Sequence, residues 1–372
     1  MKNNIGFIAI GQAGMNIGML FEKAGHTVLH INTSQEDLAT LTDSKHAYHI
    51  KGGKGCAKNR DRAKELIIED FDNISTKIQE TFQEEYVYVI FSSGGGTGSG
   101  ASPMLIDMLA QSTDKKVGAI TILPAQVEPP NVLMNSYECC KELEDIDGIG
   151  ATFILDNNKQ DKFAINREFV SLFDAFITIP QHHNFKGNID EAEIEELLTT
   201  RGAAIITKIP KNQNGQNNQN SQNNQNSQNP QLTERLIKAF RQNIFAPMEA
   251  DRIIKYIGLS SSTNVDMETI KNEVGSYLGL FQGTNSDGTI CVLTGLSFPY
   301  SALREIEWKV DENKKAISKN ISATKERKLN ASINFLADVD LDVDIQGTQD
   351  KKEIQNKPKV DPADIFAKYK RK

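Results

Sequence analysis

The sequence predicts an α/β protein with a Rossmann-like parallel sheet in its N-terminal half and a smaller α/β domain in its C-terminal half. Two observations predict this fold. In the first half, short apolar runs rich in Ile and Val alternate with segments of helical period, which is typical of a parallel sheet with helices on both faces. Glycine-rich loops follow two of these runs, and such sheets bind ligands at the carboxyl ends of their strands.

The expected strands of the first half are five apolar runs. In chain order they are IGFIAIG, HTVLHIN, YVYVIFSS, VGAITILPA and ATFILDN, beginning at residues 5, 26, 86, 117 and 151. Segments whose apolar residues have helical spacing separate most of these runs, as in NIGMLFEKAG at residues 16–25 and AKELIIEDFDNISTKIQETF at residues 63–82. We therefore expect a helix after the first strand and a long helix over 63–82.

Composition disfavours several classes of function. The chain has 372 residues and a formal net charge of -7, which argues against broad electrostatic binding of nucleic acid by the folded body. No stretch approaches the roughly 18 apolar residues of a membrane span. The cysteines Cys56, Cys139, Cys140 and Cys291 lack the paired spacing of a zinc site. The adjacent pair is expected to be reduced, which favours a cytoplasmic protein.

The most informative loop is SSGGGTGSGAS at residues 92–102, which contains five glycines within residues 94–100. So many glycines cost backbone entropy, and close approach of a ligand or of another backbone usually justifies them. Backbone N–H groups here could surround an anion at the positive N-terminus of the next helix, with hydroxyl groups as further donors. A tight strand-to-helix turn is the alternative. The candidate phosphate-binding residues are Gly94, Gly95, Gly96, Thr97, Gly98 and Ser99.

A second loop, GQAGMNIG from Gly11 to Gly18, follows the first strand. It matches the dinucleotide-binding fingerprint only in part, because Ala13 replaces the middle glycine. The second strand ends at Asn32, where an Asp or Glu would bind ribose. GGKGCAK at residues 52–58 lacks the Gly-Lys-Ser/Thr of a P-loop. A nicotinamide or flavin enzyme and a P-loop enzyme are therefore both disfavoured.

Taken in order, these loops resemble the tubulin/FtsZ family of GTP-dependent filament proteins. GGGTGSG is similar to the family signature, GQAGMNIG to the first nucleotide loop, and GKGCAKNR to the third loop of the plasmid and phage tubulins, the TubZ group. The resemblance spans Ile5 to Leu198. It implies the tubulin/FtsZ fold: a GTP-binding domain over 1–163, a central helix over 164–186 and a C-terminal activation domain over 187–300.

The resemblance also implies residues for the guanosine. ILDNNK looks like the segment whose Asn contacts guanine, which assigns base recognition to Asn157. One carboxamide can donate to guanine O6 and accept from its N1–H, although a lone Asn at a strand end is more often a cap or turn former. Phe169, in the apolar stripe of the central helix, would stack on the base. Glu128 resembles the ribose-binding acid, but the double proline after it departs from the family pattern.

For the phosphates, the resemblance implies contacts from the first loop at Gly11, Gln12, Ala13 and Asn16, with Gln12 close to the phosphates and Mg²⁺. A basic residue of the third loop would reach the γ-phosphate. Lys54, Lys58 and Arg60 are all available, and the sequence does not distinguish among them; Lys58 is carried as the candidate. Solvated loop residues are the alternative. The implied ligands are GTP or GDP with Mg²⁺.

The candidate catalytic residues lie in FKGNIDEAEIEELL, where Asn188 is followed by Asp190 and Glu193. Acids at a helix start are ordinarily explained by capping and by the helix dipole. The spacing also reproduces the family's catalytic loop, and acids three apart lie on one helical face, able to orient one water. In the family they face the γ-phosphate on the neighbouring subunit, so the resemblance implies hydrolysis that requires assembly.

The C-terminal half contains a second set of elements. Expected strands are AAIITKI, DRIIKYIGLSSS, GLFQGT and TICVLTGLS, and expected helices are residues 232–245 and 266–278. Between them, the Asn/Gln-rich insert at 212–231 has no apolar residue and is expected to be a disordered surface loop. Leu303, Ile306, Val310 and Ile317 indicate a long, partly exposed helix over 301–329, which a flexible tail over 330–372 follows.

The tail ends in DPADIFAKYKRK, and its basic residues with Ile365, Phe366 and Tyr369 could anchor on a partner. A solvated chain end is the alternative. By resemblance, the partner is a DNA-binding adaptor protein and the function is a GTP-hydrolysing filament that segregates plasmid or phage DNA. A cell-division or phage-positioning filament is the alternative within the family, and a nucleotide-binding enzyme that does not polymerise is the alternative outside it.

Overall fold

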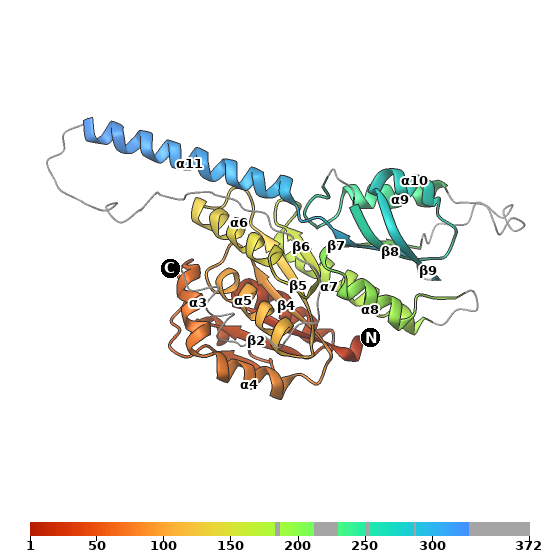
Figure 1. The fold of residues 1–372 in the computed structure, drawn as a ribbon, viewed down its shortest axis with the longest axis horizontal. Helices are drawn as coiled ribbons and strands as arrows, with labels where there is room; N and C mark the ends of the chain where they lie inside the picture. Colours follow the sequence, from red (N-terminus) through yellow and green to blue (C-terminus); the bar gives the residue numbers. More distant parts are fainter. Residues whose placement is uncertain (183–186, 212–229, 250–252, 286–287, 327–372) are drawn as a thin grey trace, which may run out of the picture.

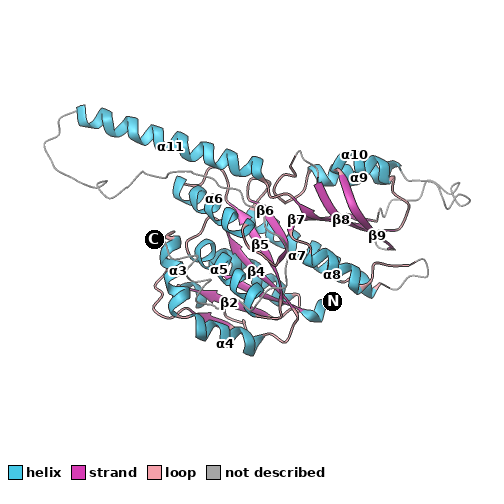
Figure 2. Ribbon diagram, in the orientation of Figure 1, coloured by secondary structure: helices cyan, strands magenta, loops and turns pink. Residues whose placement is uncertain are grey.

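The computed structural model describes residues 1–182, 187–211, 230–249, 253–285 and 288–326. They build one ten-stranded sheet in the order β3-β2-β1-β4-β5-β6-β7-β10-β8-β9. β10 is antiparallel to both of its neighbours, and the other pairings are parallel. Helices lie on both faces of the N-terminal part (Figures 1 and 2). The α/β prediction is confirmed.

The N-terminal part contains six strands and their connecting helices. They are β1 (Ile5–Ile10), α1 (Gly11–Lys23), β2 (Val28–Asn32), α2 (Gln35–Leu38), β3 (Ala47–His49), α3 (Arg60–Glu69), α4 (Phe71–Thr81), β4 (Tyr86–Ser92), α5 (Thr97–Ser112), β5 (Lys116–Leu123), α6 (Pro130–Glu144) and β6 (Ile149–Asp156). All five predicted strands are present. Every residue of β1 and of β6 is buried, which explains their largely apolar sequence.

The C-terminal part continues the same sheet. Its elements are α7 (Lys162–Ile177), α8 (Glu191–Thr199), β7 (Gly202–Pro210), α9 (Pro230–Arg241), β8 (Ile253–Ser261), α10 (Met267–Val274), β9 (Ser276–Thr284), β10 (Gly288–Leu296) and α11 (Tyr300–Glu326), with a 3-10 turn at Ile179–Gln181. A second 3-10 turn, Lys2–Asn4, precedes β1 in the N-terminal part. The predicted C-terminal strands are present. They extend the first sheet because β7 pairs with β6, from Ala151 with Gly202 to Phe153 with Ala204.

The prediction of a single helix over 63–82 is wrong, because the helix is interrupted at Asp70, between α3 and α4. This carboxylate is buried and accepts hydrogen bonds from the Tyr48 hydroxyl at 2.8 Å, the Lys51 N–H at 2.7 Å and the Asn73 amide at 2.7 Å. The backbone at Asp70 leaves the helical region, with φ -112° and ψ 12°. A tertiary contact to the β3 segment therefore sets this helix boundary.

Other boundaries also differ from the expectations. The helix expected over 266–278 stops at Val274, because Gly275 has a φ of +106° and the following residues enter β9. The central helix α7 ends at Ile177, well before residue 186, and residues 183–186 lie outside the described part. α9 begins at Pro230, inside the expected insert, whose residues 212–229 lie outside the described part, as do the tail and the last residues of the long helix.

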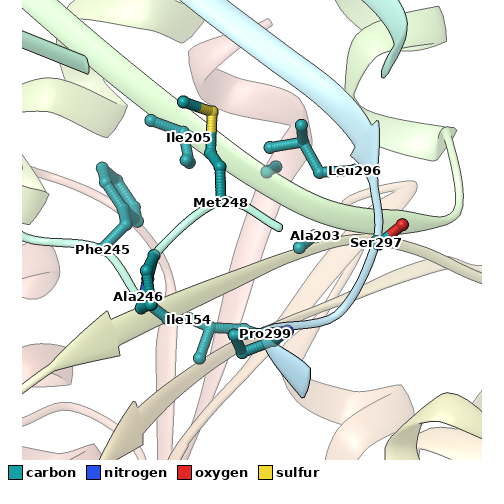
Figure 3. Close-up of a pocket in the computed structure, with 11 residues that line it drawn as sticks. Ile154, Ala203, Ile205, Phe245, Ala246, Met248, Leu296, Ser297 and Pro299 are labelled. Atoms are coloured by element: carbon teal, nitrogen blue, oxygen red, sulfur yellow. The ribbon is translucent and has the colours of Figure 1, made fainter. Parts of the chain in front are cut away.

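The junction between the two halves of the sheet is apolar and nearly filled (Figure 3). Phe245 bridges to Leu155 of β6, and the Ala246 N–H donates to the carbonyl of Ile154 at 2.8 Å. The remaining cavity has a volume of about 10 Å³, between β6, β7, residues 245–248 and the end of β10. Such a space holds about one water, so no nucleotide can bind there.

Helix α11 packs on α6 with its first half through Leu303, Ile306 and Val310, which are buried, and then continues beyond α6 (Figures 1 and 2). Ile317, later on the same stripe, is half exposed. The four cysteines are free and buried, and burial raises the pKa of the Cys140 thiol to about 12. The Cys139–Cys140 pair therefore consists of two protonated, buried thiols.

Candidate nucleotide site

The first loop and the glycine-rich loop meet at the carboxyl ends of the neighbouring parallel strands β1 and β4. Gly11 has a φ of +70°, and a Cβ at this position would lie 3.3 Å from the Gly98 nitrogen. At Gly98, an added Cβ would lie 3.2 Å from the Ser92 oxygen and 3.3 Å from the Ile10 oxygen. Glycine avoids the tight contacts that a Cβ would make at these two positions, and the approach places the N-termini of α1 and α5 side by side, both suited to anions.

The third loop lies directly against the glycine-rich loop. A Cβ added to Gly96 would lie 2.9 Å from the Lys58 nitrogen and 3.0 Å from the Cβ of Cys56. Ala57 and Lys58 have φ values of +46° and +66°. This left-handed backbone costs about 1–2 kcal/mol for each non-glycine residue. The contact between the two loops is therefore maintained against local strain, which is common at functional sites.

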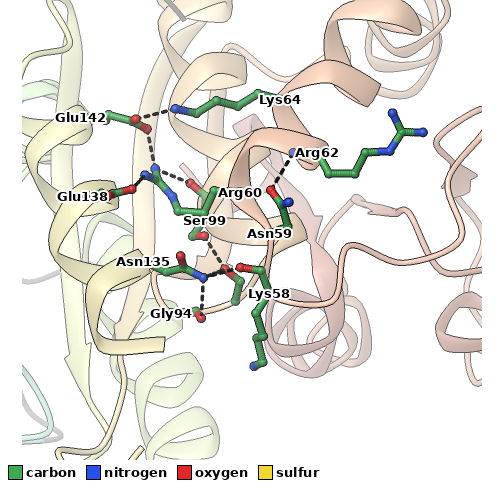
Figure 4. Close-up of polar contacts among 11 residues, drawn as sticks. Lys58, Asn59, Arg60, Arg62, Lys64, Gly94, Ser99, Asn135, Glu138 and Glu142 are labelled. Atoms are coloured by element: carbon green, nitrogen blue, oxygen red, sulfur yellow. Dashed lines mark hydrogen bonds and ion pairs between the residues drawn. The ribbon is translucent and has the colours of Figure 1, made fainter. Parts of the chain in front are cut away.

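The structure separates the three basic candidates of the third loop. The Arg60 side chain is only 4% exposed and donates to Glu138 at 2.8 Å, to Glu142 at 2.5 Å and to the Ser99 carbonyl at 3.0 Å. Arg60 therefore serves the packing of α3 on α5 and α6, and the expectation that it reaches phosphate is not supported. Lys54 and Lys58 are exposed, and Figure 4 shows the Lys58 side chain extending away from this network.

Asn157, directly after β6, has the property required of a base-recognition residue. Its side-chain Oδ1 is buried and has no hydrogen-bond partner within the described part of the chain. Its backbone N–H donates to the Leu123 carbonyl at 3.2 Å, which fixes it beside the end of β5. A buried acceptor without a partner is costly, and a donor of guanine such as N1–H would satisfy it. Gln12 and Glu128 are exposed at this same edge of the sheet, and Ala13 and Asn16 are partly exposed there.

The expectation for Phe169 is wrong. Its side chain has no exposed surface, and its ring centroid lies 5.7 Å from Phe153, 5.8 Å from Phe173 and 6.2 Å from Phe21. It belongs to the aromatic core under α7 and has no face left for a base. The sequence stripe identified a buried face correctly, but periodicity alone does not distinguish packing from ligand contact.

Phe163, which the sequence analysis missed, is an exposed aromatic residue on the first turn of α7. Its side chain is 49% exposed. α7 runs parallel to α1, because Phe169 contacts Phe21 and, further along, Asp174 contacts His26 just past the end of α1. The start of α7 therefore lies at the same edge as the start of α1. The available signal was an aromatic residue next to the helix cap Asp161, a few residues after Asn157.

Thr33 is a second residue that the sequence analysis missed. Its hydroxyl lies 2.7 Å from the Thr97 hydroxyl of the glycine-rich loop, and its carbonyl accepts from the Gly55 N–H of the third loop at 2.9 Å. It follows β2, so a polar residue just beyond a strand end was the available signal. Asn32, at the end of β2, is buried, and its amide donates to Asp37 at 3.0 Å.

The candidate catalytic residues lie at the opposite edge of the sheet. Asp190 caps α8 by accepting from the Glu193 N–H at 2.9 Å, and Glu193 accepts from the Asp190 N–H at 3.0 Å. Glu191 pairs with the amino group of Met1 at 2.7 Å, at the amino end of β1, and Figure 1 shows the N-terminus beside α8. Asp190 and Glu193 therefore form a capping box at the start of α8, and each carboxylate uses one oxygen for it.

The strand length separates the two regions. β1 has six residues, and a strand rises about 3.3 Å per residue, so the nucleotide loops and the α8 carboxylates are about 20 Å apart. Asn188 holds the candidate catalytic loop in place by donating to the carbonyls of Ile179 at 2.5 Å and His182 at 2.7 Å. Asp190 and Glu193 therefore cannot reach a nucleotide bound by their own chain.

Comparison with known proteins identifies the family. The Tubulin/FtsZ family, GTPase domain, matches residues 4–164. A tubulin-like protein TubZ of Clostridium botulinum C phage is 30% identical over 378 residues, covering 99% of this chain and 100% of that protein. The chain belongs to the tubulin/FtsZ family. It is a GTPase with the tubulin/FtsZ fold.

Solved structures of the tubulin/FtsZ family agree with the architecture. The crystal structure of Clostridium botulinum phage c-st TubZ has a TM-score of 0.72 and 29% identity, covering 85% of this chain and 100% of that one. A GTPγS-form protofilament of Bacillus thuringiensis serovar israelensis TubZ has a TM-score of 0.68 and 16% identity, covering 88% and 95%. In the described part of the chain, no helix is long and apolar enough to cross a membrane.

Proposed function

We propose that this GTPase polymerises head to tail, so that the α8 carboxylates of one subunit complete the active site on the GTP of the next. The observation that carries the proposal is the placement of the nucleotide loops and of Asp190 with Glu193 at opposite edges of one sheet, about 20 Å apart. A head-to-tail contact brings unlike edges of two subunits together, and it repeats without closing into a dimer.

In the proposed complex, guanine is recognised by the Asn157 carboxamide and stacks on Phe163, and Glu128 binds the ribose. Backbone N–H groups of the first loop and of Gly94–Ser99 surround the phosphates, and an exposed lysine of the third loop, Lys58 in our assignment, contacts the γ-phosphate. Charged hydrogen bonds of this kind contribute about 1.5–3 kcal/mol each. The assignment follows the exposed and unpartnered groups at the carboxyl edge.

Mg²⁺ fits this site as a phosphate-bound ion. In the described ranges, no three His, Cys, Asp or Glu side chains form a metal cluster. Mg²⁺ often binds through nucleotide phosphates and a few neutral oxygen donors, and Gln12 with the hydroxyls of Thr97 and Thr33 supplies such donors. When bound, the ion neutralises charge on the transferred phosphoryl group.

For hydrolysis, the second oxygens of Asp190 and Glu193 orient a water toward the neighbour's γ-phosphate. The water oxygen forms a bond to the γ-phosphorus as the bond to the bridging oxygen of GDP breaks, and the water proton is released to the phosphate product. The capping box holds both carboxylates in one orientation without consuming all their oxygens. The products are GDP and inorganic phosphate.

The biological role that we propose is segregation of plasmid or phage DNA in the bacterial cytoplasm, with a DNA-binding adaptor captured by the C-terminal tail. The relative of 30% identity comes from a phage, and a structurally similar TubZ is described as a protofilament. The tail lies outside the described residues, so its role rests on its basic sequence with interspersed apolar residues. A filament for division or phage positioning is the second candidate.

The test combines two variants with complementary defects. Asp190→Asn removes the carboxylate but keeps a good helix cap, so α8 should remain folded, and its own nucleotide pocket is untouched. Asn157→Ala weakens guanine binding and leaves both carboxylates intact. Each variant alone should hydrolyse little at limiting GTP. Mixed, they place intact carboxylates against GTP held by the other variant, and phosphate release should exceed the sum of the separate rates.

Two-colour labelling must show that both variants enter the same filaments. Light scattering with GTP and with GDP measures assembly directly. If the variants co-assemble and their rates merely add, the carboxylates do not act across the subunit contact, and the proposal must be abandoned. Absence of GTP-dependent assembly in the unaltered protein would refute the filament itself.

A further inference from the structure

One face of α6 contacts both the third loop and the glycine-rich loop (Figure 4). The Asn135 amide donates to the Lys58 carbonyl at 2.8 Å, to the Gly95 carbonyl at 3.1 Å and to the Gly94 carbonyl at 3.5 Å. Glu138 and Glu142 follow on the same face and bind Arg60 at 2.8 and 2.5 Å. We call Asn135, Glu138 and Glu142 the α6 clasp. Spacings of three and four residues place such side chains on one helical face.

The ion pairs of the clasp hold the C-terminal end of the third loop, where α3 begins. Arg60 is buried, and it also donates to the Ser99 carbonyl at 3.0 Å, so one guanidinium joins α3, α5 and α6. Lys64 adds a second cation on Glu142 at 2.6 Å. A planar guanidinium bonded to two carboxylates and a carbonyl fixes direction as well as distance. The beginning of α3 therefore cannot shift relative to the glycine-rich loop without breaking a buried pair.

The amide of the clasp holds the strained part of the loop. Asn135 bonds to the carbonyl of Lys58, one of the two consecutive non-glycine residues with left-handed backbone. The same nitrogen reaches Gly95, so the positions of the two loops are set by one donor group. Backbone strain persists only where surrounding contacts determine it, and Asn135 is such a contact.

We infer that Asn135 is a positioning residue for the γ-phosphate: it acts through Lys58, by holding the third loop against the glycine-rich loop so that the Lys58 side chain reaches the terminal phosphate. The inference rests on the proposed function in one respect, the assignment of Lys58 to the γ-phosphate. It predicts selectivity, because GDP lacks the group that Lys58 contacts. Loss of Asn135 then weakens binding of the triphosphate and spares binding of the diphosphate.

The experiment measures GTPγS and GDP affinity of the full chain by displacement of a fluorescent nucleotide, below the assembly concentration. For Asn135→Ala we expect GTPγS binding weakened by about tenfold, the effect of losing one charged hydrogen bond, and GDP binding changed by less than about twofold. Asn135→Asp should be worse than Ala, because a carboxylate would face three carbonyl oxygens. Lys141→Ala, exposed on the same helix, is the control and should leave both affinities unchanged.

A double variant separates the inference from its premise. Lys58→Ala alone should weaken GTPγS binding, and Asn135→Ala added to it should cause no further loss. Additive losses, or equal weakening of GTPγS and GDP, would overturn the role of Asn135. So would a normal Asn135→Ala when Lys58→Ala is defective. A normal Lys58→Ala would refute the Lys58 assignment and the inference together, while co-assembly of the Asp190 and Asn157 variants would still report on the split site.

Thermal unfolding of each variant shows whether a loss of affinity reflects a loss of folded protein. Asn135 is only partly buried, so the variants should unfold within a few degrees of the unaltered protein. If Asn135→Ala does not fold, Glu142→Gln provides the second variant: it keeps the side-chain shape and weakens the hold on Arg60 and Lys64. It should lower GTPγS affinity more than GDP affinity, and the opposite order would contradict the inference.

Discussion

Gly96→Ala tests the contact between the two phosphate loops with a single methyl group. Gly96 has a φ of -86° and a ψ of -65°, so alanine adopts its backbone without strain. The new Cβ would lie 2.9 Å from the Lys58 nitrogen and 3.0 Å from the Cβ of Cys56. Carbon atoms settle at about 3.5–4.0 Å, so the third loop must retreat by at least about 0.5 Å.

The cost follows from these distances. Overpacking of this kind destabilises a protein by about 1–3 kcal/mol, and replacing glycine by alanine returns about 0.4–1 kcal/mol through the unfolded chain. The net loss should be about 1 kcal/mol, which lowers the Tm by about 2 °C in a chain of this size. Because Lys58 moves with the loop, GTPγS affinity should fall by about tenfold, as expected for losing a charged hydrogen bond.

The adjacent glycine supplies the control. A Cβ added to Gly95 would meet only the Ser92 oxygen, at 3.9 Å, so Gly95→Ala should keep or slightly raise the Tm of the nucleotide-free protein. Differential scanning calorimetry without nucleotide, followed by fluorescent-nucleotide displacement, measures both quantities. If Gly96→Ala unfolds at or above the temperature of Gly95→Ala and binds GTPγS normally, the close approach of the loops is wrong.

Three other predictions address the base, pH and the insert. Phe163→Ala should weaken GTP and GDP binding alike, by about 1–3 kcal/mol for a lost stacking contact, measured by nucleotide displacement; unchanged affinity would exclude Phe163 from the base site. Burial lowers the pKa of His26 and of His30, so the unfolded chain binds protons that the native chain does not, and stability should fall as pH drops below about 6.5. Replacing both histidines by Gln should flatten that slope in urea unfolding at pH 5.5 and 7.5, and an unchanged slope would reject the assignment. Replacing residues 212–229 by a short Gly/Ser linker between β7 and α9 should leave the Tm and GTP-dependent light scattering unchanged, whereas loss of assembly in a folded variant would show that the segment contributes to it.

Much of the sheet could be predicted from the sequence because its central strands are buried on both faces. Their runs are mostly apolar, and the glycines of the first loop and of the glycine-rich loop stand at strand ends, where both signals agree. The break at Asp70 could not be predicted, since it depends on Tyr48 and Lys51 of another segment. The same holds for the extension of the sheet through β6 and β7, which local patterns do not encode.

In the site, the sequence located the loops better than the side chains. Arg60 and Lys58 look equivalent in GKGCAKNR. Yet Arg60 is buried and bonds to two carboxylates of α6, far along the chain, whereas Lys58 is exposed. Phe169 and Phe163 are both aromatic residues of one helix, and only packing on Phe21 and Phe153 shows which face is core. Motifs record which chemistry a loop supports, and long-range contacts decide which side chain performs it.

Separating the nucleotide loops from Asp190 and Glu193 by the length of a strand also makes the two ends of a filament chemically unequal. In the proposed assembly, every interior subunit has a neighbour that supplies carboxylates to its nucleotide. The subunit whose nucleotide edge faces solvent has none, and it keeps its triphosphate until another subunit arrives. An addition at that end therefore allows hydrolysis in the subunit that it covers, whereas the added subunit keeps its own triphosphate. Growth at that end would place the most recently formed contacts there and the oldest contacts farthest from it.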